Sequence, residues 1–181
     1  MIPFAASTER YSEWIRLLLR DGAETSFPDL KGKENVRTII AGSRMLSVPV
    51  EGGSSILKKK NIDPGSIVIS SHGRWQEVHL GALKAAYGRT PYFPHIFPEI
   101  ENIYMNHSGA TFEEFTGAIH NMIIKGIGLN EDSLAELKRI IDHNPDHIRR
   151  LNEERMKIID RNLSILDALF RLGKETIFVL I

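Results

Sequence analysis

Helical spacing of apolar side chains dominates the chain after about residue 74 and limits what it can fold into. A capping box at Thr111–Glu114 predicts one helix start, and Asn130 predicts another after a helix closed by Gly126. Pro98 is a favourable first-turn residue and predicts the start of a shorter helix. The helix that Asn130 starts is expected to end at Asn144–Pro145. The other expected helices are about 74–87 and 148–172, the latter with a break near Asn162.

The first third of the chain mixes strand and helix signals. The apolar run 1–6 predicts a buried strand, and Ser7 is expected to cap the helix that follows. Residues 23–27 could form a second strand. A strand, a helix and a strand in this order suggest a βαβ unit. Two β-rich runs, 38–41 and 45–50, flank a glycine-containing turn and predict a hairpin. Segment 67–69 is expected to form a strand, and segment 177–181 is expected to form either a strand or a docked tail. The predicted fold is α/β: a mixed sheet with a β-hairpin, flanked by helices, with a helical C-terminal half.

Length and charge fit a single domain over residues 1–181, of which 130–161 is the most separable part, a possible helical appendage. Lys plus Arg is 23 and Asp plus Glu is 23, so no net field attracts nucleic acid. The absence of cysteine excludes disulfides, thiol catalysis and cysteine zinc sites. No apolar run is long enough to span a membrane and no signal peptide is evident, so we expect a cytoplasmic protein.

Trp75 and His79 are one helical turn apart and are predicted to share a helix face. A histidine beside an indole could serve as a general base, or could hold an anionic group when protonated. The same pattern fits a core histidine with a single hydrogen bond, and the sequence leaves both interpretations open.

Arg37 is the best candidate in the sequence for binding an anion. Its guanidinium could hold a carboxylate or phosphate through two parallel hydrogen bonds, with Lys31 and Lys33 adding charge nearby. An exposed arginine at a strand edge is an equally good explanation. Tyr87 and Tyr92 could stack on a sugar or a base, although such aromatic residues more often close a core.

Several other polar groups have simpler structural explanations. Ser164 and Asp167 fit a capping box better than a catalytic role, and Asn162 stands just before them. A metal site in the Asp142–His147 segment is disfavoured, because a helix stop and restart needs the same residues. The lysines at 58–60 fit a solvated loop. No cofactor can be named from the sequence, and no metal site is predicted.

Four passages, taken in order, carry a resemblance to a known family. They are Asn35-Val36-Arg37-Thr38-Ile39-Ile40 leading to Leu46-Ser47-Val48-Pro49-Val50, His72-Gly73-Arg74-Trp75 leading to His79 and Tyr87, Thr90-Pro91-Tyr92-Phe93, and Asn162-Leu163-Ser164-Ile165-Leu166-Asp167. Together they resemble the WbqC-like protein family of bacteria, over about residues 37–127 and 162–181. The chain departs from the family pattern in lacking its Tyr-x-Pro opening, and Val36 separates Asn35 from Arg37.

This resemblance implies a role in assembling O-antigen or other surface polysaccharides, and the family has been suggested to transfer glycine or another aminoacyl group. We therefore expect a transferase with His79 as the catalytic residue. Arg37, Asn35, Trp75, Tyr87 and Tyr92 would bind a small and anionic substrate. The alternative is a non-catalytic small-molecule-binding or assembly module, in which the face of 131–172 pairs with a second copy in a homodimer.

Overall fold

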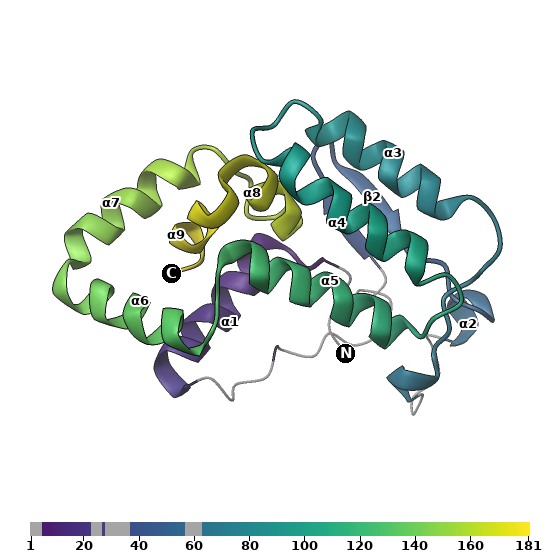
Figure 1. The fold of residues 1–181 in the computed structure, drawn as a ribbon, viewed down its shortest axis with the longest axis horizontal. Helices are drawn as coiled ribbons and strands as arrows, with labels where there is room; N and C mark the ends of the chain where they lie inside the picture. Colours follow the sequence, from purple (N-terminus) through teal and green to yellow (C-terminus); the bar gives the residue numbers. More distant parts are fainter. Residues whose placement is uncertain (1–4, 23–26, 28–36, 57–62) are drawn as a thin grey trace.

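The computed structural model describes residues 5–22, 27, 37–56 and 63–181 (Figure 1). Its longer elements are helices α1 (Thr8–Asp21), α3 (Trp75–Tyr87), α4 (Phe93–Asn106), α5 (Phe112–Ile127), α6 (Glu131–His143), α7 (Pro145–Met156) and α8 (Ile165–Leu172), and strands β1 (Arg37–Ile40) and β2 (Arg44–Ser47). Short helical turns are α2 (Gly53–Ile56), η2 (Pro64–Ser66), η3 (Gly173–Thr176) and α9 (Ile177–Leu180). The α/β class and the helical C-terminal half are confirmed.

The predicted hairpin is present, and it has one buried and one exposed face. Strands β1 and β2 pair antiparallel, with Thr38 opposite Leu46 and Ile39 opposite Met45. Thr38 and Leu46 are buried, whereas Ile39 and Met45 are exposed. Because facing residues of an antiparallel pair point to the same side, the hairpin places a polar and an apolar residue inward and keeps an apolar pair outward.

The other predicted strands have different outcomes. Ala5 and Ala6 form a buried turn rather than the end of a strand, and residues 1–4 lie outside the described part of the chain. The predicted strand 23–27 is outside the description except for Phe27. Ile69 makes an isolated antiparallel bridge to Val50 in place of a full strand. Among the described residues, the sheet is the two-stranded hairpin.

Local capping chemistry places most helix starts where the sequence predicts them. Ser7 accepts a hydrogen bond from the Arg10 amide at the start of α1. Thr111 and Asn130 each form a complete capping box at the starts of α5 and α6. Ser164 caps α8 by accepting from the Leu166 amide, so the expected break before α8 is confirmed. Each of these bonds satisfies an amide that has no partner within its helix.

Two predicted boundaries are wrong. Helix α4 begins at Phe93, and Pro98 lies inside it. Pro94 lies in the first turn of α4, where proline is favourable. Further along, burial of side chains such as Phe97 and Tyr104 outweighs the loss of the hydrogen bond that Pro98 cannot donate. Helix α5 continues past Gly126, where a methyl group would come within 3.3 Å of Leu169 on α8, and closes at the left-handed Gly128.

Helices α5 and α8 pack against each other in the core, and α1 packs against α8 and α9 (Figure 1). The C-terminal run 177–181 forms a docked helical turn, with Val179 and Leu180 buried. This corresponds to the docked tail, one of the two alternatives that the sequence predicts. Helices α6 and α7 form a helical hairpin at one side of the molecule, where α7 contacts α9. In the described part of the chain, no helix is long and apolar enough to cross a membrane.

Candidate functional site

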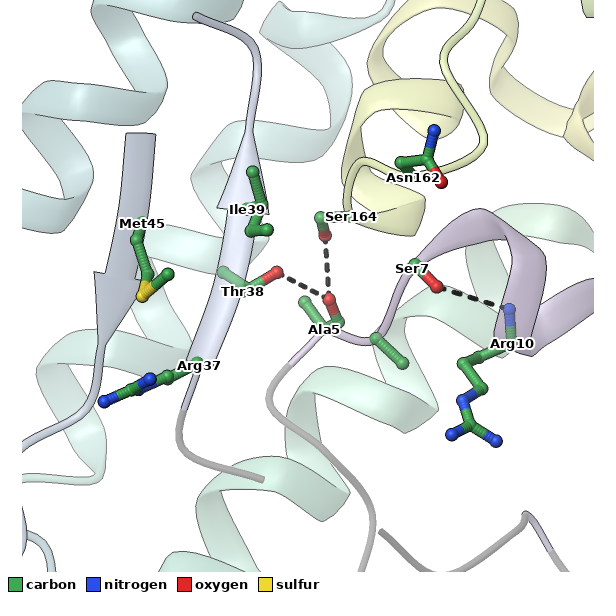
Figure 2. Close-up of a pocket in the computed structure, with 10 residues that line it drawn as sticks. Ala5, Ser7, Arg10, Arg37, Thr38, Ile39, Met45, Asn162 and Ser164 are labelled. Atoms are coloured by element: carbon green, nitrogen blue, oxygen red, sulfur yellow. Dashed lines mark hydrogen bonds between the residues drawn. The ribbon is translucent and has the colours of Figure 1, made fainter. Parts of the chain in front are cut away.

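A hollow of about 310 Å³ lies where the exposed hairpin face meets the starts of α1 and α8 (Figure 2). It is called here the Arg37 pocket. Its lining residues come from three separate parts of the chain: Ala5, Ala6, Ser7 and Arg10; Arg37, Thr38, Ile39 and Met45; and Asn162 and Ser164. Its volume is at the lower end of the range of about 300–1,000 Å³ that is typical of small-molecule sites.

The wall of the Arg37 pocket is held together around the carbonyl of Ala5. The hydroxyl of Thr38 donates to this oxygen at 2.7 Å, and the hydroxyl of Ser164 donates to it at 2.9 Å (Figure 2). The Ser164 amide in turn donates to the Ile39 carbonyl at 2.7 Å. Ala5 has a φ of 44°, a conformation that costs free energy for a residue with a Cβ atom. These bonds fix a strained turn against the hairpin.

The electrostatic character of the Arg37 pocket is cationic. Arg10 and Arg37 lie on opposite sides of the Ala5–Ser7 turn, and the starts of α1 and α8 both border the pocket (Figure 2). A helix start carries a partial positive charge. Among the described residues, Arg10 has one ion-pair partner, the exposed Glu13 at 3.6 Å, and Arg37 has none. This arrangement suits an anionic ligand.

His79 lies in an aromatic cluster rather than in the Arg37 pocket. Its side chain is only 4% exposed, its Nδ1 is 3.2 Å from the Tyr104 hydroxyl, and its ring contacts that of Trp75. Burial lowers the pKa of His79 to about 4, and a hydrogen bond with the backbone of Ser47 opposes this only in part. The imidazole is therefore neutral at physiological pH and does not supply a positive charge for an anion.

The remaining predicted binding residues occupy different surroundings. Trp75 is half-buried and donates its indole N–H to the Ser70 carbonyl at 3.0 Å. Tyr87 is fully buried and its hydroxyl accepts from the Ala41 amide at 2.8 Å. Tyr92 is 38% exposed, and its ring lies over Gly173. None of these three lines the Arg37 pocket, and Asn35 lies outside the described residues.

The family model for the WbqC-like protein family matches residues 31–157. The chain belongs to the WbqC-like protein family. Neither the curated proteins nor the solved structures gave a significant match. The matched segment of this WbqC-like protein includes Arg37 and the whole hairpin, and it stops short of Asn162 and Ser164.

Arg10 is a pocket residue of this WbqC-like protein that sequence reasoning did not find. It stands in the first turn of α1, where a positive side chain opposes the helix dipole and is unfavourable unless it has another role. That local conflict was the available signal. Asn162 belongs to the last passage of the family resemblance, but its place in the pocket depends on the meeting of α8 with the hairpin, which no local pattern predicts.

Two further predictions for this WbqC-like protein can be compared with the structure. Asp167 does not close a capping box on Ser164; it is buried and pairs with Arg171 at 3.0 Å. In the described part of the chain, no group of three or more histidine and acidic residues is arranged to hold a metal ion, the Asp142–His147 segment included. The lysines at 58–60 lie outside the description.

Proposed function

We propose that this WbqC-like protein is a cytoplasmic transferase in the assembly of bacterial surface polysaccharide, and that it binds an anionic acyl donor in the Arg37 pocket. One observation carries the proposal. Arg37, from the first passage of the family resemblance, and Asn162 and Ser164, from the last, line a single hollow together with Arg10. Residues of separate passages that converge on one cationic hollow suit ligand binding better than a solely structural role.

The chemistry proposed is transfer of an acyl group, of which an aminoacyl group is the example suggested by the family resemblance. An amine or hydroxyl of a sugar attacks the acyl carbon, the bond between that carbon and the donor's oxygen breaks, and the anionic carrier leaves with the bonding electrons. The proton of the attacking group passes to a base or to water. Arg37 and Arg10 would hold the carrier and stabilise the charge it gains on leaving.

The catalytic role of His79 remains a separate proposal. The low pKa leaves its imidazole unprotonated but makes it a weak base, and its Nδ1 is already within hydrogen-bond distance of Tyr104. A base must reach the proton it removes, directly or through one water. For a catalytic role, His79→Gln must lower kcat while the affinity for the donor stays the same, and an unchanged kcat would exclude it.

A transfer assay tests the proposed function. Acetyl phosphate serves as the donor and glucosamine as the acceptor, and N-acetylglucosamine is measured by mass spectrometry against a protein-free blank. Arg37→Gln is expected to lower kcat/KM by about tenfold to a hundredfold, because it removes charge-assisted hydrogen bonds. The control is Arg44→Gln, on the same hairpin but outside the Arg37 pocket. Product at the level of the blank, or equal loss in both variants, would contradict the proposal.

A non-catalytic binding module is the second candidate, and a specific observation favours it. The described lining of the Arg37 pocket contains no histidine, carboxylate or lysine that could act as a general base. In its assembly form, this candidate uses the 131–172 segment, which the structure divides into α6, α7 and the buried α8, and whose exposed apolar side chains include Ile140 and Ile158. Light scattering at micromolar concentration would then give twice the monomer mass, and binding of a donor would occur without turnover.

A further inference from the structure

An apolar pair borders the cationic part of the Arg37 pocket. Ile39 and Met45 face each other across the hairpin and are 40% and 56% exposed. Both line the pocket, and Figure 2 shows Met45 close to Arg37. Ile39 is two residues along β1 from Arg37 on the same face, a separation of about 7 Å. A ligand that extends from Arg37 along the strand therefore meets apolar side chains.

The charges of the lining exclude one class of ligand. The described lining residues include two arginines and no aspartate or glutamate. A free amino acid would bring its ammonium group into this setting without a carboxylate to pair with, while two guanidinium groups repel it. The other polar side chains in the described lining, which belong to Ser7, Thr38, Asn162 and Ser164, are neutral.

We infer that the ligand of the Arg37 pocket is an aliphatic anion without a positive charge, its carboxylate or phosphate at Arg37 and its chain across Ile39 and Met45. This inference rests on the proposed function, because it concerns the same pocket. It narrows the transferred acyl group to an aliphatic one, in place of glycine. Apolar contact and charge pairing then act on the two ends of one small molecule. The occupant that competes for the exposed apolar pair is a second copy of the chain.

Calorimetric titration of the full chain tests this inference without relying on turnover. The probes are acetate, butanoate and hexanoate, a parallel series of methyl, butyl and hexyl phosphate, and 2-aminobutanoate. Each fully buried methylene strengthens binding by about fourfold, so a partly covered chain should gain about tenfold between acetate and hexanoate. Butanoate should bind about tenfold more tightly than 2-aminobutanoate, which differs from it only by the ammonium group. The series with the higher affinity identifies the anionic group.

Two methionines offer a matched pair of variants. Met45 in the Arg37 pocket and Met105 on α4 are both 56% exposed. Met45→Gln is expected to remove most of the gain with chain length, and Met105→Gln to leave it intact, with circular dichroism confirming that both fold. Arg37→Gln should weaken every probe of a series by a similar factor.

The outcomes separate the two proposals. If the anions bind through Arg37 but the affinity is the same for acetate and hexanoate, or Met45→Gln and Met105→Gln behave alike, the inference of an aliphatic ligand is wrong and the anion pocket remains. If no probe binds, or Arg37→Gln has no effect, the pocket fails as an anion site and the proposed function fails with it. Sedimentation that shows a dimer disrupted by Met45→Gln would assign the apolar pair to a second copy and overturn the inference.

Discussion

At the scale of single residues, the Ala5 carbonyl is the point on which the candidate site depends. Thr38 and Ser164 are far apart in the sequence, yet both donate to this one oxygen. Ala5 is buried, so its carbonyl cannot turn to water when these donors are lost. The strained backbone at Ala5 persists because its surroundings hold it in place.

Thr38→Val and Ser164→Ala should therefore lower stability in a coupled way. Each single change leaves one donor on the Ala5 oxygen and should cost about 1 kcal/mol, with Ser164→Ala costing more because it also removes the cap of α8. The double variant leaves the carbonyl without either donor and should cost roughly 1 kcal/mol more than the sum. Urea unfolding measures this, with the exposed Ser54→Ala as control. Additive costs would show that the two bonds are independent.

Two histidines, the buried His79 and the half-buried His120, should make stability depend on pH. Burial lowers the pKa values of His79 and His120 to about 4, below the ordinary value of 6.5. Between these values the unfolded chain binds protons that the folded chain does not, so stability falls as the pH drops from 7 to 5. The loss should be on the order of 1 to 2 kcal/mol per histidine. His120→Gln should halve the slope of the unfolding free energy against pH in chemical unfolding, and a free energy independent of pH over this range would contradict the lowered pKa values of the two rings.

At the scale of elements, the sequence predicts what short-range chemistry decides. The starts of α1, α5 and α6 could be predicted because Ser7, Thr111 and Asn130 bond to amides within three residues. The start of α4 could not be predicted, because burial of side chains along the helix outweighs the loss of the hydrogen bond that Pro98 cannot donate. The continuation of α5 through Gly126 depends on the close approach of α8, and such a tertiary contact cannot be predicted from neighbouring residues in the sequence.

The η3 turn gives a prediction that also bears on Tyr92. Gly128 and Gly173 both have positive φ, but only at Gly173 would an added methyl group come within 2.5 Å of the Tyr92 ring. Gly128→Ala should cost about 1 kcal/mol from backbone strain in the left-handed region. Gly173→Ala should cost more, because φ 55° and ψ −129° form a conformation that is nearly restricted to glycine and because overpacking adds about 1 to 3 kcal/mol. Thermal unfolding measures both. In a Tyr92→Ala background the difference between the two substitutions should shrink by the overpacking part, and a difference of unchanged size would mean that Tyr92 is not the obstacle.

At the scale of the whole molecule, the Arg37 pocket joins two segments of the first quarter of the chain with residues 162–164, which lie more than 100 residues further along. The sequence could identify Arg37 as an anion binder and Asn162 and Ser164 as polar residues of a familiar passage. It could not bring them together, because their meeting requires α1 and α8 to dock on the hairpin. His79 does not line this pocket, although the sequence predicts it to act as the catalytic residue on a ligand bound by Arg37.

Mapping of amide chemical shifts by NMR during titration with butyl phosphate tests the central claim most directly. If the Arg37 pocket binds the anion, shifts should appear together in three segments, 6–10, 37–45 and 162–164, because all three line one hollow. They should vanish in Arg37→Gln and persist in Arg44→Gln. Shifts confined to the cluster of Trp75 and His79, or shifts that survive Arg37→Gln, would contradict the account.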